Sequence, residues 1–147
     1  MLEDQQKEFN LRFRIATGMA VGFFVMNFIF LGVGVVAQPP LASQAEKFTN
    51  VLLLWSLMPI GVAVVLRKKF NERVKRETEF SKKLALLLQG TIVVFGVIES
   101  ISSIGLIFVI QGLPNARVLQ YFLAGVVLLA FSIFFPRRAA WESLLSE

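Results

Sequence analysis

Residues 84–111 read LALLLQGTIVVFGVIESISSIGLIFVIQ, an apolar stretch whose only charged side chain is Glu99. A helix that crosses a bilayer needs roughly 20 apolar residues, and this stretch is longer. It lacks the period-two alternation of a membrane strand. Three further stretches are long enough to cross, at residues 15–37, 48–66 and 118–135. The sequence therefore predicts an all-α integral membrane protein, a four-helix bundle that forms one domain over residues 1–147.

The composition also indicates a lipid environment. Hydrophobic residues make up 56% of the chain and charged residues 17%, whereas a soluble domain has about 45–50% and about 25%. The chain has no Cys and no His, which excludes thiolate nucleophiles, Cys- or His-ligated zinc and Ser-His-Asp triads. We therefore expect no enzyme, no catalytic residue, no metal site, and no cofactor other than H⁺ or Na⁺.

The basic residues near the ends of the stretches predict the orientation, because cytoplasmic segments carry an excess of Lys and Arg. The two tails and the loop 67–83 together hold thirteen basic residues, whereas the other two loops hold only Lys47 and Arg117. Four crossings place both tails and the loop 67–83 on the same side. We expect an N-in, C-in topology with a basic cytoplasmic loop.

The loop 67–83 contains neither Pro nor Gly, and two structures are open for it: an extension of the flanking helices or a short surface helix. Its basic residues favour an anchor to anionic lipid headgroups, with a docking surface for a soluble partner as the alternative. We expect no nucleic-acid partner because these charges lie beside a membrane. The expected headgroup-binding residues are Arg67, Lys68, Lys69, Arg137 and Arg138.

The two ends of the chain carry separate predictions. The first stretch, 15–37, is longer than the roughly 7–15 residues of a signal-peptide core, so we expect a retained anchor helix. The absence of a transit-like N-terminus favours a bacterial inner (plasma) membrane, where the chain would be multi-pass. After Pro136, an amphipathic run predicts an interfacial helix with an apolar face formed by Trp141, Leu144 and Leu145.

Glu99 is the candidate functional residue. It lies near the middle of its stretch, where a charged carboxylate costs at least a few kcal/mol, so the acid either stays protonated or finds a cation. We interpret it as a functional site, or alternatively as a protonated acid that hydrogen-bonds a neighbouring helix. Ser102 and Ser103, on the same helical face, and Asn27 in the first stretch are the expected ion-binding partners.

Small residues predict close helix packing. Gly18 and Gly22 form a GxxxG pair, the spacing that lets two helices approach closely in lipid. Asn27 is positioned to hydrogen-bond across that contact. Gly96 lies three residues before Glu99, on the same face of the predicted helix. These faces favour a homo-oligomer.

Residues 90–110, GTIVVFGVIESISSIGLIFVI, resemble the carboxylate-bearing helix of the proteolipid (c) subunits of rotary ATP synthases. In that family a mid-membrane Glu or Asp is often followed by a small residue and then an aliphatic stretch containing Gly or Ser. Glu99, Ser100 and Gly105 match that pattern. The resemblance implies a ring of subunits and a carboxyl group that binds and releases H⁺ or Na⁺, and it covers this stretch alone.

The function that we expect is an oligomeric or accessory subunit of a larger membrane complex. Its partners would be membrane lipids and either further copies of the chain or other membrane subunits. The alternative is a proton- or Na⁺-translocating subunit with Glu99 as its site. A small transporter ranks third, because one intramembrane charge and no clear internal repeat leave little for a substrate site.

Overall fold

The computed structural model describes residues 3–37, 49–112 and 115–146. Within these residues every regular element is a helix and no strand occurs, which confirms the all-α prediction. The helices are α1 (Glu3–Val36), α2 (Thr49–Arg76), α3 (Phe80–Ile110), α4 (Ala116–Phe134) and α5 (Arg138–Ser146).

Three helices in the described part of the chain, α1, α3 and α4, are long and apolar enough to cross a membrane. They contain the predicted stretches 15–37, 84–111 and 118–135 to within one residue at their C-terminal ends. The predicted stretch 48–66 begins outside the described residues, and its remainder forms the first part of α2. These long apolar helices indicate a multi-pass membrane protein.

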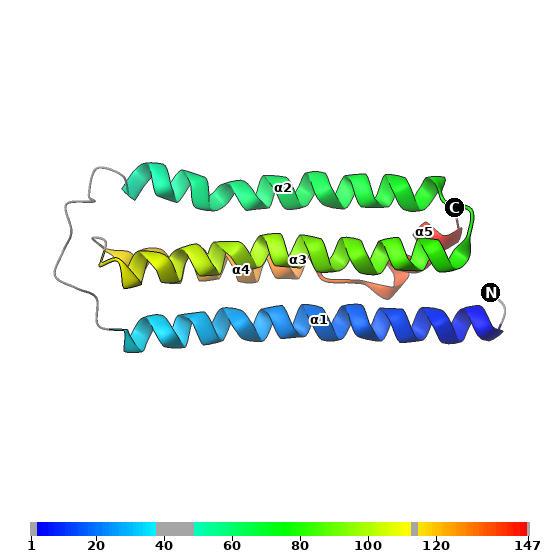
Figure 1. The fold of residues 1–147 in the computed structure, drawn as a ribbon, viewed down its shortest axis with the longest axis horizontal. Coiled ribbons are helices and arrows are strands. Elements are labelled where there is room, and N and C mark those ends of the chain that lie inside the picture. The colour runs from blue at the N-terminus through cyan, green and yellow to red at the C-terminus, as the bar shows by residue number, and fades with distance from the viewer. Residues whose placement is uncertain (1–2, 38–48, 113–114, 147) are drawn as a thin grey trace.

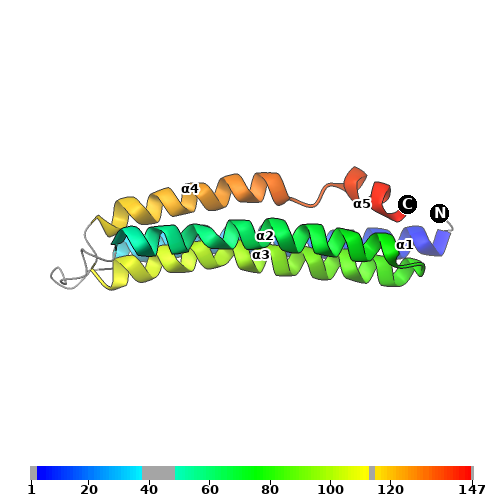
Figure 2. The same cartoon turned by 90° about the horizontal axis from the view of Figure 1, so that it is seen from above.

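α3 is the central helix, since it packs against α1, α2 and α4, and α1 also packs against α4. Figure 1 shows α1 and α2 on either side of α3, and Figure 2 shows α4 and α5 together on one face. Both termini and the α2–α3 connection lie at the same end of the molecule (Figure 1). We call it the basic end, because the loop 67–83 and both tails hold most of the Lys and Arg residues.

The loop 67–83 is formed by extension of the flanking helices. α2 continues to Arg76 and α3 begins at Phe80, so only residues 77–79 between them are non-helical. The Glu77 carboxylate accepts the backbone N–H groups of Thr78 (2.9 Å) and Glu79 (3.2 Å). These two hydrogen bonds hold the pKa of Glu77 below its ordinary value and stabilise the tight connection.

Two apolar clusters hold the helices together. The larger one surrounds α3, where Phe95 stacks on Phe131 of α4 and on Phe23 of α1, with ring centroids 4.9 and 6.4 Å apart. The smaller cluster lies at the basic end and joins residues of four helices. Its buried members are Phe9, Ala16, Val74, Leu84, Leu87 and Trp141.

The predicted helix after Pro136 is present as α5, and it packs its tryptophan against the protein. Trp141 is only 5% exposed. Its ring meets those of Phe13 and Phe9 edge-on, at centroid distances of 5.4 and 6.4 Å. The two phenylalanines lie in the part of α1 that precedes the apolar stretch 15–37. The sequence of the C-terminal tail alone does not reveal that they are its aromatic partners.

Two glycines outside the GxxxG pair admit close packing within the chain. A Cβ atom on Gly34 would clash with the Gln120 side-chain amide, and one on Gly90 would lie 2.9 Å from the ring of Phe70. In contrast, a Cβ atom on the predicted packing glycines would meet no atom of the described residues within 4 Å. These are Gly18, Gly22 and Gly96. These three glycines therefore make no close helix contact within the described part of the chain.

Candidate buried polar site at Glu99

Glu99 lies on the side of α3 that faces α1. Residues four before and three after it share its helical face, and both contact α1: Phe95 through Phe23, and Ser102 through Asn27. The Glu99 residue is 7% exposed. The apolar pattern of α3 thus places one carboxyl group inside the α1–α3 interface.

One polar contact crosses this interface directly. The Ser102 hydroxyl donates to the Asn27 side-chain oxygen over 2.5 Å, and the two residues are 4% and 0% exposed. Asn27 was predicted to hydrogen-bond across the Gly18–Gly22 contact, but its observed partner belongs to α3 of the same chain, whereas Cβ atoms on Gly18 and Gly22 would meet no described residue within 4 Å.

Several polar atoms beside this contact have no hydrogen-bond partner among the described residues. They are both carboxyl oxygens of Glu99 and the side-chain nitrogen of Asn27. Ser103 donates to the backbone carbonyl of Glu99 at 3.5 Å, so its bond does not reach the carboxyl group. The structure therefore brings Asn27, Ser102 and Glu99 to one interface. The Ser103 hydroxyl instead bonds the backbone of its own helix, one turn back.

Three side chains at this interface carry oxygen atoms. Glu99, Asn27 and Ser102 supply oxygen atoms, and oxygen ligands suit hard cations. No group of three or more His, Cys, Asp or Glu residues that could hold a metal ion occurs in the described part of the chain. A buried polar group without a partner costs about 1–3 kcal/mol, and the Glu99 carboxyl group has no hydrogen-bond partner among the described residues.

Gln120 is a structurally important polar residue that the sequence analysis did not single out. It is 3% exposed, and its side-chain amide donates to the backbone carbonyl of Phe30 at 2.9 Å. Its Cα atom would lie 3.4 Å from a Cβ atom on Gly105 of α3. Gln120 thus links α4 to both α1 and α3, and its signal in the sequence is an amide within the apolar stretch 118–135.

A second polar link was also missed, at the basic end. Arg12 on α1 contacts Glu8 at 2.7 Å and donates to the Ser81 hydroxyl at 3.2 Å. Ser81, on α3, in turn donates to Glu8 at 2.7 Å. The three side chains are partly buried, and they join α1 to α3 beside the apolar cluster of the basic end.

The predicted headgroup residues fall into two groups. Arg67 and Arg138 engage the protein: Arg67 donates to the carbonyl of Ile133 at 3.1 Å, and Arg138 pairs with Glu142 at 2.8 Å. The other three are exposed on the surface of the basic end. They are Lys68, Lys69 and Arg137.

Comparison of the chain with protein-family models, with curated proteins and with solved structures found no match. By its fold, the chain is a small helical protein with three candidate membrane-spanning helices in its described part.

Proposed function

We propose that the chain is a four-span, N-in, C-in integral membrane protein that serves as an oligomeric or accessory subunit of a larger membrane complex. In this proposal Glu99 is its buried carboxyl site, which holds a proton or a cation. The main observation in favour of this site is that both carboxyl oxygens of Glu99 are buried without a hydrogen-bond partner among the described residues.

The topology is supported by the arrangement of charge and of chain ends. Both termini and the α2–α3 connection lie at one end (Figure 1), and most of the Lys and Arg residues lie in these segments. The positive-inside rule makes that end cytoplasmic. α2 packs along α3, and its residues 54–66 carry no charge, as a fourth span requires.

The subunit role is supported by the uncovered face of α1. Val21, Phe24 and Phe28 are 47%, 41% and 48% exposed, and Gly18 and Gly22 leave open space beside them. Lipid tails can cover the apolar side chains, but a GxxxG pair specifically permits the close approach of another helix. We therefore place the contact between subunits on this face of α1.

The oligomeric state tests the subunit role. The wild-type chain in mild detergent is expected to form a discrete oligomer in native mass spectrometry, and Gly18→Leu with Gly22→Leu is expected to shift it to monomers. The matched control is Gly61→Leu with Gly125→Leu, which adds the same bulk at two glycines that also have open space. A monomeric wild-type chain, or equal behaviour of the two double variants, would contradict the proposed contact.

A second candidate function is translocation of H⁺ or Na⁺ through Glu99. It is favoured by the burial of the Glu99 carboxyl group without a partner among the described residues, in the same interface as the Ser102–Asn27 bond. The resemblance of residues 90–110 to the proteolipid subunits of rotary ATP synthases favours the same reaction. In this function the carboxyl group must exchange its cation instead of keeping it permanently.

A further inference from the structure

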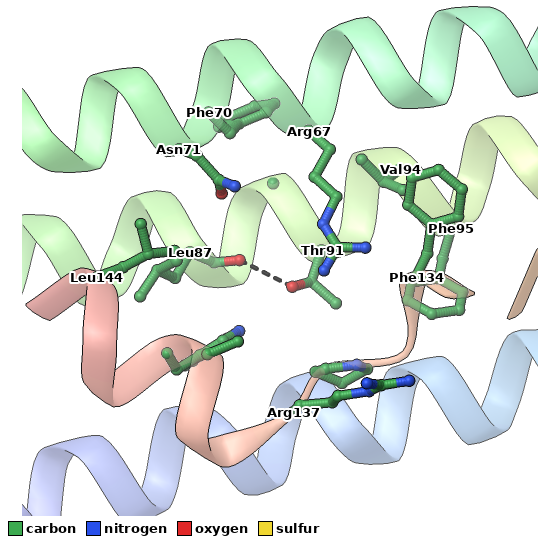
Figure 3. A pocket seen from close by; sticks show the side chains of 14 residues that line it. Arg67, Phe70, Asn71, Leu87, Thr91, Val94, Phe95, Phe134, Arg137 and Leu144 are labelled. Carbon is green, nitrogen blue, oxygen red and sulfur yellow. Dashed lines mark hydrogen bonds between the residues drawn. The ribbon is translucent and has the colours of Figure 1, made fainter. Parts of the chain in front are cut away.

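A pocket of about 80 Å³ opens at the basic end between α2, α3 and the segment that joins α4 to α5. Figure 3 shows Arg67 and Asn71 reaching into it from α2, with Arg137 on the joining segment at its other side. Apolar side chains such as Leu87 and Phe134 form much of its wall. The pocket thus combines an apolar lining with two guanidinium groups from different segments.

The two arginines have no acidic partner among the described residues. Arg67 lies over the ring of Phe134, 5.2 Å from its centroid, and uses one nitrogen to bond the carbonyl of Ile133. Burial, and then the positive charge of Arg137, lower the pKa of Arg67. The two cations therefore repel each other, with Arg67 partly buried and Arg137 exposed, and a bound anion would relieve that repulsion.

The geometry suits an anion with several acceptor oxygens. A guanidinium group carries five N–H donors in a rigid fork that matches phosphate, and the bond to Ile133 leaves Arg67 with donors to spare. The Asn71 amide adds a neutral donor on the same wall. A phosphate group can accept hydrogen bonds from both arginines and the amide at once.

The depth of the pocket points to a lipid. Arg67 directly follows the apolar stretch 48–66, and Arg137 lies two residues after the end of the stretch 118–135. In the proposed membrane placement, on which this inference rests, both arginines lie at headgroup level. We propose that the pocket binds a phosphate ester group, supplied by the headgroup of an anionic phospholipid.

Native mass spectrometry of the full chain in micelles tests the site, with dioctanoyl phosphatidylglycerol as probe and dioctanoylglycerol, which lacks the phosphate, as comparison. Arg137→Gln is the decisive variant, because its side chain makes no hydrogen bond or ion pair within the described part of the chain. We expect it to weaken phosphatidylglycerol binding about five-fold, since a basic residue at the headgroup contributes about 1 kcal/mol. Arg67→Gln with Arg137→Gln is expected to weaken it further.

The charge control is Lys68→Gln with Lys69→Gln, which removes two exposed cations from the same end of α2. Equal losses in this control and in Arg137→Gln, or equal binding of dioctanoylglycerol, would overturn the proposal. A second experiment measures the thermal stability of the protein with and without inorganic phosphate. Stabilisation by phosphate that depends on Arg137, without lipid binding, would support the phosphate site and assign it to a free anion. None of these variants touches the α1 face, so the oligomer test stands or fails separately.

Discussion

Trp141→Ala is expected to lower the free energy of unfolding by about 3–5 kcal/mol, the usual cost of removing a large buried aromatic side chain. The Trp141 residue is 5% exposed and meets Phe9 and Phe13 edge-on. Its loss would leave a cavity in the cluster that joins α5 to the basic ends of the long helices. An SDS titration of the protein in mixed micelles, followed by circular dichroism, measures the change.

Trp55→Ala is the matched control, because the other tryptophan of the chain is 67% exposed on α2. Substitutions at exposed positions usually change stability by no more than about 0.5 kcal/mol. If the two variants lose similar, small amounts of stability, Trp141 lies in the membrane interface as the sequence pattern predicts, and the packing of α5 against α1 is wrong.

Glu99→Leu is expected to raise the free energy of unfolding of the dispersed chain by about 1–3 kcal/mol. The substitution removes a buried group that has no hydrogen-bond partner among the described residues, and the desolvation penalty of such a group is of this size. The same titration in dilute micelles, at a protein concentration where the chain is monomeric, gives the value. A gain in stability on replacing Glu99 would indicate that the carboxyl group serves function and does not stabilise the fold.

Ser102→Ala, at the same interface, is expected to lower the free energy of unfolding, the opposite of the change expected for Glu99→Leu. It breaks the hydrogen bond to Asn27, and interhelical hydrogen bonds within membranes contribute about 0.6 kcal/mol on average. We expect a loss of that order. If Glu99→Leu also destabilises the isolated chain, the carboxyl group bonds another helix of the same chain, and Glu99 is structural.

The spans could be predicted from the sequence because hydropathy is a local property. The stretch 84–111 is long, apolar and interrupted only by Glu99, so its helix and the burial of that acid follow from its own residues. The extension of α2 to Arg76 was one of two open alternatives. The choice between them depends on the Glu77 hydrogen bonds that close the turn, which residue types alone do not reveal.

The contacts between helices were harder to predict, because they depend on register. Gln120 hydrogen-bonds the backbone of α1 at a residue ninety positions away in the sequence. The sequence around Gln120 does not indicate that Gly34 leaves the space for its side-chain amide. For the same reason, the open positions of Gly18 and Gly22 on α1 became visible only in the folded chain. Periodicity assigns a face to a residue, but it does not say which neighbour covers that face.

The most direct test of the Glu99 site is the labelling of reconstituted protein by a hydrophobic carbodiimide across a range of pH, with the modified residue located by mass spectrometry. A buried carboxyl group that exchanges its proton is expected to react selectively at Glu99, and the reaction is expected to fall as the pH rises and the acid ionises. Protection by added Na⁺ would identify Na⁺ as the bound cation, whereas labelling that is indifferent to Na⁺ would identify H⁺. An absence of labelling at every pH would contradict an exchangeable site and leave Glu99 as a sealed acid in a purely structural subunit.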